Sequence, residues 1–188
     1  MIRKLGFILP IIGALLALGA ATVYAQTATG TQNVSFTAVA TIGITSTADV
    51  AFGSLTTTTT KTGSFTLNSN DPNGFSLTTQ PSGSNYAAGK IGESVIPAQT
   101  CSAAQTFPVG NVTVTPHAVT GMTTGTGGTA AAPFALTGSP QALFSVNPTG
   151  QGTTMAMNAD YTVNVSGIPF NTAGCQYLWT MTYTMSAL

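Results

Sequence analysis

The C-terminal stretch Trp179-Thr180-Met181-Thr182-Tyr183-Thr184-Met185-Ser186 alternates large apolar side chains with hydroxyl side chains. Successive side chains of a β-strand point to opposite faces, so this stretch predicts a strand with one face toward a core. The same alternation recurs along the chain at roughly ten-residue spacing, which is typical of an all-β domain. The other alternating runs are Val34–Ile44, Phe65–Leu67, Phe75–Leu77, Val112–Val114, Met155–Met157 and Tyr161–Val165.

No stretch after residue 25 repeats apolar residues at helical spacing, and the frequent Thr, Val, Phe and Tyr favour pleated, half-buried positions. Several short strands predict an all-β fold, a single antiparallel β-sandwich of immunoglobulin-like or pilin-like type. Residues 26–188 are long enough for one such domain and short for two. Asp71-Pro72-Asn73-Gly74 has the residues of a tight turn, so we expect a hairpin between the runs around Phe65 and Phe75. Gly53 indicates a bulge or a close backbone approach.

Residues 1–25 have the pattern of a secretory signal peptide. Arg3 and Lys4 supply the positive start, an apolar run follows, and Ala25 is the small residue expected before the cut. We expect cleavage after Ala25, which makes the mature protein extracellular or cell-surface, without a membrane segment. Two alternatives stay open: a retained N-terminal apolar helix, and a type IV pilin leader, because Lys4-Leu5-Gly6-Phe7 resembles the cleavage site of such prepilins.

The chain after Ala25 is almost without charge. Two lysines and four carboxylates give it a formal charge of −2, with no arginine. Nucleic acid needs a basic face, so we expect no nucleic-acid partner. Threonine is the most frequent residue, and a surface of hydroxyls in place of charges removes repulsion between copies.

The few chemically active side chains do not form a recognisable catalytic motif. His117 is the only histidine, no Gly-x-Ser-x-Gly pattern stands beside it, and we expect it to be a loop residue. Asp71 lies in the predicted turn, and Asp160 is expected to begin the strand Tyr161–Val165. We therefore expect no enzyme, no cofactor and no metal site.

Cys101 and Cys175 are the only cysteines. An even pair in an exported chain predicts a disulfide between them. The bridge would close a long loop and stabilise the fold by roughly 4 kcal/mol in the chain-entropy model. Two unpaired thiols are the alternative.

The longest alternating run, Val34–Ile44, suggests how copies could assemble. Such a strand, preceded by the polar segment Gln26–Gln32, can pair in its own domain or add to another copy's open sheet edge. Natural monomers protect sheet edges with charge, above all Lys, and this chain has little. We therefore expect residues 33–44 to be a donor strand in a secreted structural subunit of a filament, pilus or surface matrix, with copies of itself as partners. Its apolar phase is Val34, Phe36, Ala38, Ala40, Ile42 and Ile44.

The alternative is a surface domain for carbohydrate binding or adhesion, with surface glycans as partners and loops 81–90 and 120–132 as candidate contacts. An exposed cluster of aromatic side chains would favour it, whereas buried aromatics and self-association would favour the structural subunit. Whether the chain is a major subunit, a cap or a monomeric adhesin stays open.

Two motifs point to one group of proteins. Ile44–Leu55 (ITSTADVAFGSL) is similar to the pattern Ile-Thr-x-Thr-x-Asp-Leu-x-Phe-Gly, with Val50 in place of Leu. Asp160–Val165 resembles the strand Gly-x-Tyr-x-x-x-Val-x-Val, with Ala159-Asp160 in place of the Gly region. Both patterns occur in small secreted bacterial β-sandwich proteins of the pilin-like or spore-coat-U-like type. The resemblance implies a surface or fibre protein and transfers no functional residue.

Overall fold

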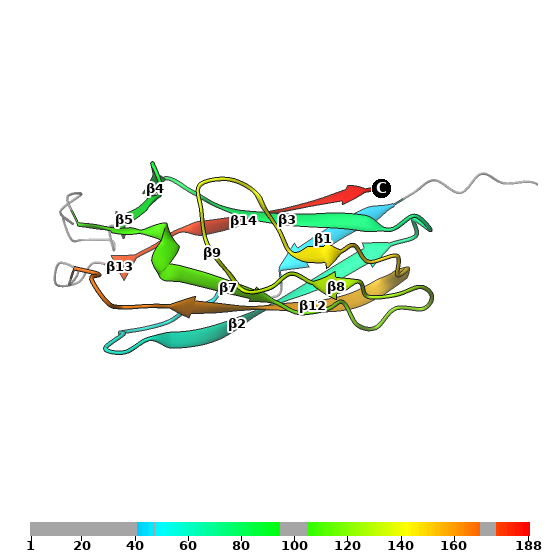
Figure 1. Ribbon diagram of the computed structural model, residues 1–188, viewed down its shortest axis with the longest axis horizontal. Helices are drawn as coiled ribbons and strands as arrows, with labels where there is room; N and C mark the ends of the chain where they lie inside the picture. Colours follow the sequence, from blue (N-terminus) through cyan, green and yellow to red (C-terminus); the bar gives the residue numbers. More distant parts are fainter. Residues whose placement is uncertain (1–40, 47, 95–104, 170–175) are drawn as a thin grey trace, which may run out of the picture. The chain divides into compact units, whose positions relative to one another are not determined.

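The computed structural model describes residues 41–46, 48–94, 105–169 and 176–188 (Figure 1). Contacts divide the chain into the units Met1–Thr37 and Ala38–Leu188, and all described residues belong to the second. The expected signal peptide, the disulfide cysteines Cys101 and Cys175, and the first part of the expected donor strand lie outside the described residues. That part comprises Val34, Phe36, Ala38 and Ala40.

The described residues form an antiparallel all-β sandwich, as the alternating runs predict. The larger sheet has five strands in the order β1 (Ile42–Ser46), β2 (Thr59–Ser69), β12 (Gly152–Val163), β7 (Val112–Pro116) and β9 (Phe134–Ala135). The second sheet has three, in the order β10 (Gln141–Ala142), β3 (Phe75–Ser82) and β14 (Thr180–Ala187). None of the described segments is a helix long and apolar enough to cross a membrane.

Two smaller groups of strands form sheets of their own. One group centres on β5 (Lys90–Ser94), which pairs with β4 (Tyr86–Ala87), β6 (Thr106–Pro108) and β13 (Gln176–Tyr177). A short 3-10 helix, η1 (Val109–Asn111), joins β6 to β7. The other group pairs β8 (Thr129–Ala130) with β11 (Phe144–Val146).

The core consists of the inward phases of strands from both sheets. β2 and β12 pair over most of their length, and every second residue is buried from Gly63 of β2 and from Met155 of β12 onward. The inward row of β12 is Met155, Met157, Ala159, Tyr161 and Val163. Phe75 and Leu77 of β3 belong to the same buried cluster. The period of two therefore sets which side chains enter the core.

The structure corrects two expectations about the ends of strands. Asp160 does not begin a strand, because it lies inside β12 with its side chain on the outer face. The Asp71–Gly74 turn exists, since Asn73 N–H donates to Asp71 Oδ1 at 2.9 Å and Gly74 has φ +96°. It is not a hairpin, because the strands it joins, β2 and β3, belong to different sheets. The turn carries the chain from one layer to the other.

Gly53 also differs from its expected role. It has φ +69°, and the space where a Cβ would stand is open to 4 Å. Gly53 lies outside the strands in the left-handed conformation that glycine adopts readily, and the expectation of a bulge or close approach is wrong.

The described end of the expected donor strand pairs within its own domain. β1 pairs with β2, so that Ile42 lies opposite Ser69 and Ile44 opposite Leu67. Ile44 also packs against the core. Within the described residues, the expected donor strand is thus a sheet strand of its own copy from Ile42 onward.

Candidate functional site

β14 is a long strand at the edge of a sheet. It pairs with β3 in an unbroken register from Thr180 opposite Ser82 to Ala187 opposite Phe75. The order of the three-stranded sheet ends at β14, and among the described residues β1 of the larger sheet lies close to β14 without pairing with it. β14 spans eight residues and contains no charged residue, proline or glycine. Charge, proline and bulges are the usual devices that protect a sheet edge from pairing with another chain.

The other strands at the sheet ends are shorter. Within the described ranges, β4, β9, β10 and β13 have two residues each, and β1 has five. Very short edge strands offer too few main-chain groups for stable pairing. β14 is therefore the longest strand that ends a sheet in the described part of the fold.

One hydrogen bond shows which residues of β14 direct their main-chain N–H and C=O groups toward the edge. Leu188 N–H donates to Gly74 O at 3.2 Å, and these residues continue the register of β14 and β3. Hydrogen-bonded pairs alternate along an antiparallel ladder. Thr180, Thr182, Thr184 and Ser186 therefore bond β3. The residues that direct N–H and C=O toward the open edge are Met181, Tyr183, Met185 and Ala187.

The inward side chains of β14 are less covered than those of its neighbour. Met181, Tyr183 and Met185 are half-buried, whereas the matching phase of β3 is fully buried. Trp179, just before β14, is also half-buried and stacks on Phe52 with centroids 6.4 Å apart. A strand added at this edge would cover apolar surface as well as bond main-chain groups.

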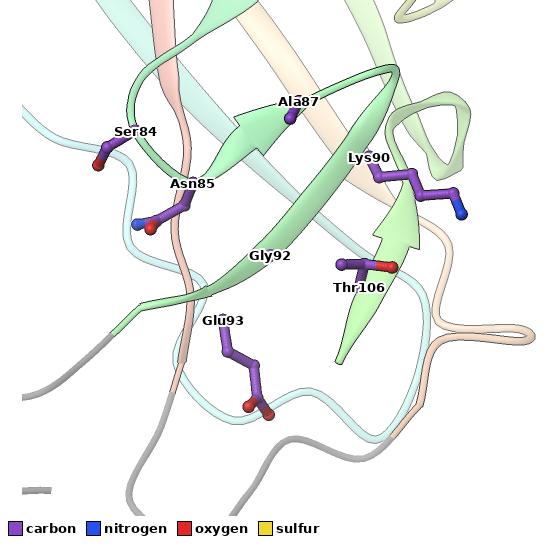
Figure 2. A pocket seen from close by; sticks show the side chains of 7 residues that line it. All are labelled: Ser84, Asn85, Ala87, Lys90, Gly92, Glu93 and Thr106. Atoms are coloured by element: carbon purple, nitrogen blue, oxygen red, sulfur yellow. The ribbon is translucent and has the colours of Figure 1, made fainter. Parts of the chain in front are cut away.

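A small pocket lies beside the β4–β5 hairpin (Figure 2). Its volume is about 260 Å³, and its lining residues are Ser84, Asn85, Ala87, Lys90, Gly92, Glu93 and Thr106. Figure 2 shows the Lys90 and Glu93 side chains pointing in different directions, so the charged groups do not converge on one point. The pocket includes part of loop 81–90, expected as a glycan contact, but no aromatic ring lines it. It lacks the flat apolar platform on which a sugar ring stacks.

A polar cluster on the outer face of the larger sheet joins β2 and β12 to His117, which follows β7 and lies outside the strands, as expected. His117 Nε2 lies 2.9 Å from Asp160 Oδ2, and Thr62 Oγ1 donates to Asp160 Oδ1 at 2.6 Å. These bonds hold the pKa of Asp160 below its usual value, first through Thr62 and then through His117. The carboxylate stands between the hydroxyl and the imidazole, whereas a nucleophile triad requires the imidazole in the middle. The cluster therefore links strands and has no nucleophile geometry.

The aromatic side chains belong mostly to the core. Phe107 contacts Tyr177 edge-on at 4.9 Å and Trp179 at 6.3 Å. Burial raises the pKa of Tyr177, and the nearby Glu93 carboxylate adds to the rise. No group of three or more His, Cys, Asp or Glu side chains within the described residues could hold a metal.

Sequence reasoning recognised the strand Trp179–Ser186 but missed that it is an edge. The one available signal was an uncharged run without Gly or Pro at the end of a chain poor in edge protection. No protein-family model matches this chain, and comparisons with curated proteins and with solved structures find no match either.

Proposed function

We propose that this protein is a secreted structural subunit of an extracellular filament, pilus or surface matrix, assembling by addition of a β-strand from one copy to another. The observation that carries the proposal is the open edge of β14, with its regular register and uncharged sequence. Addition of a strand to such an edge gains a row of main-chain hydrogen bonds.

The charge distribution supports self-association. Four Asp and Glu and four Lys and Arg are all the charges in the full chain, and two of the basic residues lie in the expected signal peptide. Repulsion between copies is therefore small, and the edge has no charged side chain that a neighbour would have to desolvate.

The outer face of the smaller sheet has the same character. Its hydroxyl side chains bond one another across strands, as Ser82 Oγ and Thr182 Oγ1 do at 2.7 Å. Thr180, Thr182 and Thr184 are exposed. This face stays solvated without charge, which suits a protein that packs among copies of itself.

The carbohydrate-binding alternative gains no specific support. The described pocket lacks an aromatic lining, and the aromatic pairs lie against the core. We therefore keep the structural subunit as the proposed function.

The test uses the exported mature protein, with its first residue established by N-terminal sequencing. We expect filaments in negative-stain electron microscopy, with a sedimentation coefficient that rises with concentration. Hydrogen exchange should show the amides of Met181, Tyr183 and Met185 protected in the assembly and exchanging faster in the monomer.

A matched pair of variants distinguishes the effect of losing a main-chain N–H at the edge from the effect of losing a side chain. Met185→Ala and Met185→Pro both remove the half-buried side chain, but only proline removes the N–H that faces the edge. We expect filaments from Met185→Ala and monomers from Met185→Pro. A protein that stays monomeric at every concentration, or exchange rates in the filament equal to those in the monomer, would refute the proposal.

A further inference from the structure

We infer that the strand added to β14 consists of residues 33–40 of a second copy. This inference rests on the proposed function and names the segment that fills its open edge. It is argued from where β1 begins, from the direction of β14, and from the match between the two segments.

The first argument concerns the start of β1. Thr41 N–H donates to Asn70 Oδ1 at 2.6 Å, and Asn70 N–H donates to Thr41 O at 3.2 Å. Ile42 lies opposite Ser69, where β2 ends, and the chain then turns into the other sheet at Asp71–Gly74. β2 therefore has no residue left to pair with the alternating run that precedes Thr41.

The second argument concerns the direction of the chain's own β14, which its own β1 approaches without pairing. β14 runs toward the Asp71–Gly74 turn, because Ala187 lies opposite Phe75 and Leu188 bonds Gly74. β1 runs away from that turn. If the residues before Thr41 paired with β14 of the same copy, they would have to run toward the turn in order to reach Thr41 there. The chain would then have to reverse its direction at Thr41 to enter β1. Tight reversals favour Gly, Pro, Asn or Asp, and the sequence Ala40-Thr41-Ile42 contains none of them.

The third argument is the match between the two segments. Residues 33–40 equal β14 in length, and neither contains a charge. The four apolar side chains of the segment alternate with Asn33, Ser35, Thr37 and Val39, so one face can join the half-buried row of β14. Four residues of β14 direct main-chain groups outward to receive it. The apolar side chains are Val34, Phe36, Ala38 and Ala40.

The donor segment and the acceptor edge are different surfaces of the chain. A contact between unlike surfaces is head-to-tail, and it continues into an open filament unless the rotation closes a ring. Each copy would accept a strand at β14 and donate its own segment to the next copy.

The test mixes two full-length mature variants. Phe36→Asp blocks the donor, because it places a charge in the apolar phase, and Met185→Pro blocks the acceptor edge. Each variant alone should be monomeric, with an association constant reduced at least about 100-fold. An equimolar mixture should form heterodimers and no filaments, because it contains one working donor and one working acceptor. Thr37→Asp carries the same charge on the polar phase, and it should still form filaments.

The outcomes separate this inference from the proposed function. Filaments formed by Phe36→Asp, while Met185→Pro remains monomeric, would overturn the donor assignment and leave strand addition at β14 in place. Symmetric dimers formed by Phe36→Asp would show that two β14 edges pair with each other. A Thr37→Asp protein as defective as Phe36→Asp would contradict the assigned apolar phase. Absence of any assembly by the unmodified protein would refute the proposed function itself.

Discussion

The ring of Phe65 in β2 lies against the ring of Tyr183 in β14, with centroids 4.5 Å apart and planes at 53°. The contact joins the two sheets near the middle of β14, in a tilted arrangement that aromatic pairs favour. Tyr183 also directs its main-chain groups toward the open edge. The residue that closes the core on this side is therefore part of the edge that we propose for assembly.

Tyr183 contributes a ring to the core and a hydroxyl that the core does not use. The hydroxyl oxygens of Tyr183 and of its cross-strand neighbour Thr79 are buried, and neither has a hydrogen-bond partner among the described residues. Burial raises the pKa of Tyr183, and the Thr79 hydroxyl, which is close but does not meet hydrogen-bond geometry, offsets a smaller part of that rise. An unpaired buried hydroxyl carries a desolvation cost. We expect Tyr183→Phe to raise the free energy of unfolding by up to about 1 kcal/mol.

Urea unfolding of the monomeric protein measures this change. Phe65→Ala is the control for the ring contact, and it should lower the free energy of unfolding by about 3–5 kcal/mol. A loss of stability in Tyr183→Phe would show that the hydroxyl has a partner in solution.

The polar cluster around Asp160 predicts a pH dependence of stability. Folding lowers the pKa of Asp160 through Thr62 and His117, so the folded state favours the carboxylate. This stabilisation is present above the ordinary pKa of an aspartate and is lost as the pH falls through the lowered value. Asp160 and His117 are both partly exposed, so the effect should stay below about 1 kcal/mol.

Asp160→Asn tests this prediction. We expect a lower urea midpoint than in the unmodified protein at pH 7, and no difference at a pH below the titration of Asp160. Asp49→Asn, which removes an exposed carboxylate, is the control for the loss of one negative charge. A difference between Asp160→Asn and the unmodified protein that persists at low pH would assign the effect to packing.

Alternation predicted the strands well because burial of one sheet face depends only on the period of two. Alternation did not predict how deeply a strand is buried or which strand it pairs with, because these depend on neighbours distant in the sequence. Met181, Tyr183 and Met185 alternate as regularly as the core row of β12, yet they are half-buried, because β14 lies at an edge and β12 between two strands. The Asp71–Gly74 turn failed for a similar reason. Local turn chemistry fixes the reversal but not whether the flanking strands pair.

The length of β12 could have been found from the sequence. Met155, Met157, Ala159, Tyr161 and Val163 keep one unbroken period of two, and only the charge of Asp160 suggested a boundary. A charge on the outer phase is compatible with the middle of a strand, as the Thr62 bond shows. The His117–Asp160 contact joins β12 to the residue that follows β7, and no pattern in one strand indicates it.

Two glycines with the same backbone conformation predict very different tolerance to a side chain. Gly53 has φ +69° and an open surrounding, whereas Gly128 has φ +71° and a Cβ there would overlap the Val146 carbonyl oxygen. Both replacements by alanine incur the left-handed backbone cost of about 1–2 kcal/mol. We expect Gly128→Ala to lose about 1–3 kcal/mol more, because the backbone must shift.

Thermal unfolding of the two variants side by side measures the difference, with Gly53→Ala as the matched control. Equal losses in the two proteins would mean that the loop around Gly128 relaxes freely.

The disulfide between Cys101 and Cys175 remains a prediction, because both cysteines lie outside the described residues. Gln176, next to Cys175, lies opposite Ser94 at the end of β5, and Gln105 O accepts from Glu93 N–H at 3.3 Å. Gln105 follows Cys101 by four residues, a reach of roughly 13 Å when extended. Both described flanks therefore lie at the same end of β5.

Non-reducing peptide mapping of the exported protein should find the linked pair. Cys101→Ser should lower the free energy of unfolding by roughly 4 kcal/mol, less if the bridge is strained. The double variant with Cys175→Ser should lose no more than either single variant, because both changes remove the same bond. Two thiols that react fully with a thiol reagent in freshly exported, unreduced protein would disprove the bridge, and the flanks at β5 would then be held by strand pairing alone.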